Sequence, residues 1–169
     1  PEFVLANFSV FIEYAKLLAK RLAEFHQTMA GDRLKAAFRP ESFTAFYQHS
    51  QYQSMLATTK NVLRMLRKNL NRLPESDRAT AEMILASERE IISRFKPIRN
   101  QKFSSKRIRV HGDHSLGKIL YTGKDFMLWD FHGEPDRSTS ERRNKTSPLW
   151  DMATMLRSAH YASLTAIYN

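Results

Sequence analysis

Two aspartates occupy loop positions in the one part of the chain where the hydrophobic pattern changes from helical to strand-like. The segment reads RIRVHGDHSLGKILYTGKDFMLWDFHGEP, residues 107–135. Asp113 follows one alternating run, and Asp130 comes 17 residues later, where another run ends. This spacing allows a β-hairpin to bring both carboxylates to the same end of a small sheet. One carboxylate as a base and one as a magnesium ligand would suit phosphoryl transfer.

Histidines surround the two aspartates, and they permit a second interpretation. His111 can hydrogen-bond the loop that Gly112 turns, which would orient Asp113. Imidazole and carboxylate are also ligands for zinc or iron. The alternative is therefore a transition-metal site made of His111, Asp113, His114, Asp130 and His132. Its pattern lacks the additional upstream histidine of the metallo-hydrolases that it superficially resembles.

Helices must position this segment, because the rest of the chain shows helical periodicity. Three helices are predicted before it: from Ser9 to about Met29, from a start at 40–42, and from 74–77 to a stop at Pro97. Inward-facing side chains predicted for the first and last helices include Val10, Phe11, Tyr14, Leu22, Met152, Met155, Leu156 and Ala159. Strands are predicted over 107–111, 118–121 and 126–131, with a turn at 122–125.

The resulting fold class is mainly α with a small β-hairpin insert, an α+β arrangement. At 169 residues the chain is expected to be a single domain, residues 1–169. Its predicted parts are a helical region 9–96, a β segment 107–135, a basic loop 136–148 and a final helix 149–167.

Composition narrows the class of protein. The chain has no cysteine, which excludes disulfides and thiolate metal sites. No apolar run approaches the roughly 20 residues that span a bilayer, and the N-terminus lacks a secretory pattern. We therefore expect a cytoplasmic protein with no membrane partner. The net charge of +10 is spread along the chain without a block of like charges, so a nucleic-acid groove is the less favoured explanation.

Three motifs in order carry a resemblance to a known family. They are HGDHSLGKIL at 111–120, DFHGEP at 130–135 and ERRNKTSPLWD at 141–151. Together they resemble the maltokinases, which are aminoglycoside phosphotransferase-like members of the protein-kinase-like superfamily and are often fused to trehalose synthase. The likeness extends to LAEFH at 22–26 and FTAFYQHSQYQSM at 43–55.

The resemblance implies a role for each matching residue. Asp113 would be the general base facing the anomeric hydroxyl of the sugar, and Asp130 would hold Mg²⁺. His111 would brace the catalytic loop, and Asp151 would anchor that loop from the last helix. At matching positions, Glu134 is assigned to the sugar and Arg143 to the nucleotide phosphates. At two positions that depart from the family pattern, His132 is assigned to the sugar and Lys118 to the phosphates.

The implied activity is a transferase of carbohydrate metabolism and glycogen biosynthesis, which uses ATP and Mg²⁺ to convert maltose to maltose 1-phosphate. The implied fold is the C-terminal lobe of a protein-kinase-like protein. No glycine-rich loop precedes the first helix, so the N-terminal lobe is expected to be absent from these residues. The chain by itself is therefore predicted to be inactive, with that lobe and a trehalose synthase domain as partners.

The sequence departs from the family pattern at three places. Lys118 occupies the position of an amide metal ligand, His132 that of a glutamate, and His114-Ser115 that of a Tyr-His pair. A charged lysine has donors only and cannot bind a metal. Either the site works with one metal ion or it has lost efficient catalysis. The non-enzyme alternative is a degenerate kinase-like module for binding or scaffolding.

Overall fold

The structure is a computed structural model, which describes residues 2–31 and 34–168. The chain divides into two compact units. Unit 1 joins residues 1–42 to 105–169, and unit 2 comprises 43–104. All of the residues assigned to the candidate site belong to unit 1. Among the described residues, no helix is long and apolar enough to cross a membrane.

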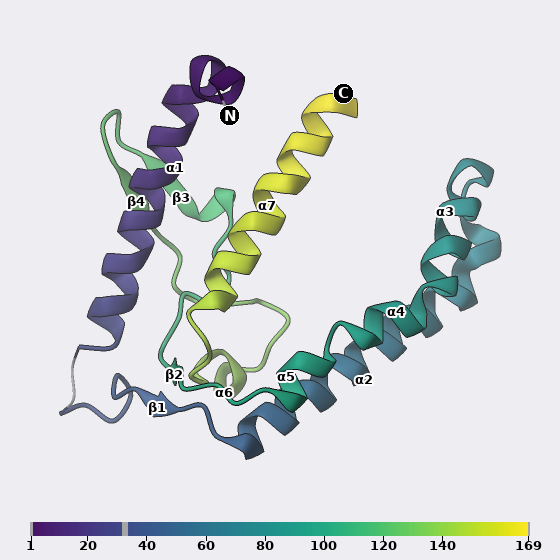
Figure 1. The fold of residues 1–169 in the computed structure, drawn as a ribbon, viewed down its shortest axis with the longest axis horizontal. Helices are drawn as coiled ribbons and strands as arrows, with labels where there is room; N and C mark the ends of the chain where they lie inside the picture. The colour runs from purple at the N-terminus through teal and green to yellow at the C-terminus, as the bar shows by residue number, and fades with distance from the viewer. Residues whose placement is uncertain (1, 32–33, 169) are drawn as a thin grey trace. The chain divides into compact units, whose positions relative to one another are not determined.

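Unit 2 is a helical hairpin built on one long helix. Helix α2 (Ala45–Asn69) runs out, and α3 (Glu75–Ala86), α4 (Glu88–Ser93) and α5 (Lys96–Asn100) return alongside it (Figure 1). The Gln48 side chain donates to the carbonyls of Ile98 and Gln101, at 2.8 and 2.5 Å. These two bonds fix the returning chain against the start of α2.

Two predicted helix boundaries are wrong in this part of the chain. The helix expected to open at 40–42 begins at Ala45, because the Thr44 hydroxyl caps it by accepting from the Tyr47 N–H. The helix expected to run from 74–77 to Pro97 is broken into three. Pro97 lies in the first turn of α5, where its missing N–H removes no helical hydrogen bond.

Unit 1 places two long helices and two small antiparallel sheets around the candidate site. Its helices are α1 (Glu2–Met29), α6 (Thr139–Arg142) and α7 (Leu149–Tyr168). Strand β1 (Glu41–Ser42) pairs with β2 (Lys106–Arg107), and β3 (Ile119–Tyr121) pairs with β4 (Phe126–Leu128). The β3–β4 hairpin and the final helix were predicted. The strand expected at 107–111 is shorter, and a single bridge from Ile108 to Thr146 follows it.

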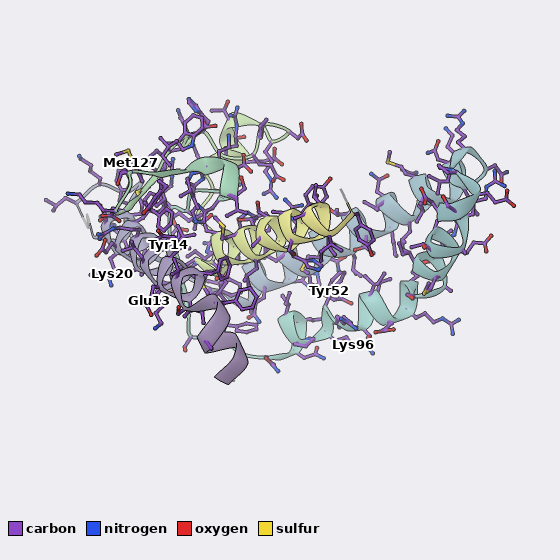
Figure 2. The ribbon with its side chains drawn as sticks, turned by 90° about the horizontal axis from the view of Figure 1, so that it is seen from above. Glu13, Tyr14, Lys20, Tyr52, Lys96 and Met127 are labelled. Carbon is purple, nitrogen blue, oxygen red and sulfur yellow. The ribbon has the colours of Figure 1, made fainter. Side chains whose placement is uncertain are left out.

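The hairpin is held on α1 by polar and aromatic contacts. Arg21 donates from Nε to Asp125 Oδ1 at 2.8 Å and from a terminal nitrogen to Oδ2 at 2.7 Å. The hydroxyls of Tyr14 and Tyr121 lie 3.1 Å apart. Tyr14 also makes an edge contact with the Phe126 ring, at 5.8 Å between centroids, and Figure 2 labels its place on α1. The start of the segment that leads to Asp130 is thereby fixed to the first helix.

Few side chains are fully buried, and part of the predicted inward stripe is wrong. Leu22 and Ile108 are buried in unit 1, and Leu63 is buried in unit 2. Phe11 and Leu156 were predicted to face inward but are 67% and 69% exposed. Val10, Tyr14 and Met152 of the same predicted set are exposed as well, at 64%, 41% and 48%, so most of the set is not covered by the described part of unit 1.

Neighbouring residues on α2 test the packing of unit 2. Leu63→Ala should destabilise the unit by about 2 to 5 kcal/mol, because Leu63 is 3% exposed and its removal leaves a cavity. Val62→Ala is the matched control, since Val62 is 55% exposed. Hydrogen exchange of the α2 amides measures both. Equal losses in the two variants would contradict the observed packing.

Candidate active site

The carboxylates of Asp113 and Asp130 meet at one ammonium group. Lys118 Nζ donates a hydrogen bond to Asp130 Oδ2, and it lies 3.8 Å from Asp113 Oδ2. Lys118 ends a short 3₁₀ turn immediately before β3, and its carbonyl accepts from the Trp129 N–H at 3.2 Å. The two aspartates therefore share one partly exposed site, as the sequence spacing allowed.

Asp130 is held in a strained backbone conformation with both carboxylate oxygens engaged. It is the one non-glycine residue with positive φ in the described chain, at 60°. Its Oδ1 lies 2.6 Å from Nδ1 of His132. Lys118 above all, and His132 second, lower the pKa of Asp130 to about 2. The group is thus a carboxylate at any ordinary pH.

Each of the two aspartate loops contains a glycine with positive φ. Gly112 and Gly133 have φ of 84° and 74°, which favours glycine. A Cβ at Gly112 would lie 3.5 Å from the Cα of Gly133. An added methyl group would therefore only touch the backbone that follows Asp130, so the positive φ, rather than the space available, favours glycine at position 112.

Asp151 secures the Asp113 loop from inside the fold. Its side chain is fully buried at the start of α7, where Oδ2 accepts from the His111 N–H at 2.8 Å and Oδ1 from the Gly112 N–H at 2.9 Å. His26 Nε2, on α1, lies 2.8 Å from the same Oδ2. Burial raises the pKa of Asp151, but the hydrogen bonds from His26, Gly112 and His111 outweigh it, so the pKa is lowered.

His111 links the two loops through its ring. Its Nε2 donates to the Trp129 carbonyl at 2.9 Å, and that assignment leaves Nδ1 as the acceptor facing the Asp113 N–H at 3.4 Å. The ring also packs against Phe131, with centroids 5.1 Å apart, and Phe131 stacks on Phe25. His111 thus connects the backbone of each aspartate loop to the other.

His114 is buried without a polar partner. It has no exposed surface, and neither ring nitrogen has a hydrogen-bond partner. Burial, followed by repulsion from His111, lowers the pKa of His114 to about 4. It is therefore a neutral part of the packing beneath the loop.

Of the other predicted site residues, His132 contacts Asp130, whereas no hydrogen bond or ion pair joins Glu134 or Arg143 to either aspartate among the described residues. The His132 side chain is 86% exposed, and its one side-chain partner in the described part of the chain is Asp130. Glu134 forms an ion pair with Arg137, with 2.5 Å between the nitrogen and the oxygen. Arg143 follows α6 as its C-cap. Its neighbour Arg142 packs on Gly133 and donates to the His132 carbonyl at 3.3 Å.

Sequence reasoning missed two contributors. His26 received no role at the site from the sequence, and in the structure it bonds the buried Asp151; its place at the end of the LAEFH segment was the available signal. Arg142 is the neighbour of the predicted Arg143 in the same motif. The sequence does not show which of the two arginines contacts the Asp130 loop, and in the structure it is Arg142.

The residues present do not fit a divalent cation between the aspartates. Both oxygens of Asp130 already have donors, and an ammonium carries no lone pair with which to bind a metal. Among the described residues, no group of three or more histidine, aspartate or glutamate side chains could hold a metal ion. The five residues of the alternative zinc or iron site therefore do not form such a group.

Comparison with solved structures identifies the class of fold. The chain has an α+β fold, as predicted, and this fold is similar to that of part of the solved glucosamine kinases. The sequence matches no family model. The resemblance to maltokinase in particular remains a prediction.

Similar solved structures include glucosamine kinases. Crystal form A matches with a TM-score of 0.68 at 20% identity over 98% of this chain, and form B with 0.67 at 19% over 88%. A complex with glucosamine, ADP and inorganic phosphate matches with 0.61 at 18% over 88%. The chain spans about a third of those proteins, at 36%, 32% and 35% of their lengths.

Replacing the buried carboxylate of Asp151 tests how much it contributes to the stability of unit 1. Asp151→Asn should destabilise unit 1 by on the order of 3 kcal/mol, because the amide turns a donor toward a backbone N–H or toward His26. Asp136→Asn, at an exposed position, should change stability by less than about 0.5 kcal/mol. Urea denaturation measures both. A loss below about 1 kcal/mol for the first variant would contradict this description.

The neutral His114 should make the chain sensitive to acid. Its pKa is about 4 when folded, against 6.5 for the free side chain, so between these values the unfolded chain binds the extra proton. The stability is fully present above pH 6.5 and falls toward pH 4, by up to about 1.4 kcal/mol per pH unit from this group. His114→Leu should lose this component in urea titrations across that range.

His160→Leu is the control for that measurement, since His160 is an exposed histidine. Carboxylates titrate in both variants, so the difference between the two pH profiles isolates the buried imidazole. Parallel profiles would show that His114 is accessible to protons in the folded chain.

Proposed function

We propose that this chain is the C-terminal lobe of an ATP-dependent sugar kinase that phosphorylates maltose at its anomeric hydroxyl, giving maltose 1-phosphate. One observation carries the proposal: the Asp113 and Asp130 carboxylates converge on a single ammonium, on loops of a fold shared with glucosamine kinases. Under it, the two compact units act as one lobe.

In the proposed reaction Asp113 is the base. Its carboxylate takes the proton of the sugar hydroxyl as that oxygen forms a bond to the γ-phosphorus of ATP, and the bond from phosphorus to the β–γ bridging oxygen breaks to release ADP. His111 and Asp151 are positioning residues, since they hold the backbone on the N-terminal side of Asp113. Asp130 retains its negative charge beside the transferred group, where Lys118 partly offsets it.

The sugar specificity rests on the motifs. DFHGEP places Glu134 and His132 after Asp130, and these two side chains are proposed to contact the sugar. One of the similar glucosamine kinases was solved with glucosamine, ADP and inorganic phosphate. Glucosamine is therefore the second sugar to test.

The remaining parts of the site are proposed to come from outside these residues. The similar kinases are about three times as long as this chain, so a second lobe would supply the other wall of the nucleotide site. Arg143, which is exposed, is available to phosphates that such a lobe presents. A trehalose synthase domain is the further partner that the motifs suggest.

A specific observation favours a second candidate, a kinase-like module that binds without turning over. Lys118 is bonded to Asp130 and faces Asp113, so it stands where catalysis would otherwise require a metal. In that case sugar or nucleotide would bind the complete protein without phosphate transfer.

The complete protein should produce sugar phosphate, and Asp113→Asn should lower kcat by about 10² to 10⁴ because the base is lost. The measurement is ADP release with maltose or glucosamine, together with ³¹P NMR of the product. Asp136→Asn is the matched control at an exposed carboxylate.

The 169-residue chain alone should form no sugar phosphate, since it lacks the proposed second lobe. Phosphate transfer by the chain alone would contradict the need for that lobe. Binding of sugar and ATP by the complete protein with no transfer would support the binding module, and full activity of Asp113→Asn would exclude this aspartate as the base.

A further inference from the structure

Lys118 occupies the place between the two aspartates in a way that leaves little freedom. Its backbone carbonyl accepts from the Trp129 N–H, and its ammonium donates to Asp130. The backbone and the side chain of Lys118 are therefore both bonded to the two residues that follow β4. Nζ lies 3.8 Å from Asp113 Oδ2 and 5.5 Å from the centre of the Trp129 ring. The ammonium thus lies beside two anions and one aromatic face, in a side chain that is 23% exposed.

Charge decides what this position can accept. The two carboxylates alone would present two negative charges to a cation, and Lys118 reduces that to one. A divalent ion bound there would also lie beside a fixed positive charge, and that repulsion, which is modest in bulk water, grows at the lower effective dielectric near a protein surface. With a neutral side chain at 118, two carboxylate ligands would face the same space, which is the donor type that hard divalent ions prefer.

We propose that Lys118 is a resident cation, which takes the place of a divalent metal ion between Asp113 and Asp130 and keeps the pair closed to such ions. This inference rests on the proposed function only where it takes the two aspartates to serve phosphate transfer. The ion-binding behaviour that it describes does not depend on that reaction. The charge of the pair is offset without any ion from solution, and the two loops are held together before a ligand arrives.

The test uses Tb³⁺ as the probe ion on the purified 169-residue chain. Trp129 is 43% exposed and close to Lys118, so it should sensitise the luminescence of an ion bound between the aspartates. Lys118→Gln should tighten Tb³⁺ binding at least about tenfold relative to the unaltered chain. Adding Asp130→Asn to that variant should remove the gain, which assigns the ion to this pair.

Matched variants separate charge from other effects. Lys118→Arg keeps the charge, and Lys124→Gln removes an exposed lysine from the turn of the same hairpin, so both should bind Tb³⁺ as weakly as the unaltered chain. Lys118→Met is measured in parallel as a second neutral variant in case the glutamine variant fails to fold, which circular dichroism reports. Mn²⁺ titration followed by electron paramagnetic resonance repeats the comparison with a divalent ion.

Tight binding by the unaltered chain, equal to that of the neutral variants, would overturn the proposal, as would a gain that survives Asp130→Asn. Neither result depends on sugar phosphorylation. A complete protein that fails to phosphorylate any sugar would overturn the proposed function and leave the assignment of Lys118 intact.

Discussion

A buried carboxylate with three donors determines where the candidate site lies. Asp151 has no exposed surface, and an unpaired charge at that depth would be strongly unfavourable. The N–H groups of His111 and Gly112 and the ring of His26 satisfy it. The loop that carries Asp113 therefore cannot shift without leaving that charge unsatisfied, and its position is tied to both α1 and α7.

The second aspartate is positioned by different means. The β3–β4 hairpin is fixed on α1 by the Arg21–Asp125 pair, and the chain then turns at a positive φ to present Asp130. His111 joins this turn to the Asp113 loop through the Trp129 carbonyl. Hydrogen bonds to the backbone thus set the distance between the loops, and Lys118 balances the charge that the arrangement brings together.

The sequence predicted the parts of the fold that have local signals and missed those that depend on distant partners. The Thr122–Asp125 turn defined the hairpin, and the final helix was placed from its periodicity. Pairing of β1 with β2 was not predicted, because strands of two residues carry no period and Glu41 meets Arg107 from 66 positions away. The bond between His26 and Asp151 spans 125 positions, so helical periodicity around His26 could not reveal it, and the LAEFH segment was the one signal for this residue.

Fold and chemistry are separable in this site. Likeness to glucosamine kinases at about 20% identity shows how the chain is folded, and a fold hosts more than one activity. The framework of Asp151, His111 and the two glycines would hold the aspartates in place with either a lysine or an amide at 118. The side chain at 118 instead determines the charge between them. A single substitution there can therefore change which cation the site accepts while the backbone that presents both carboxylates stays the same.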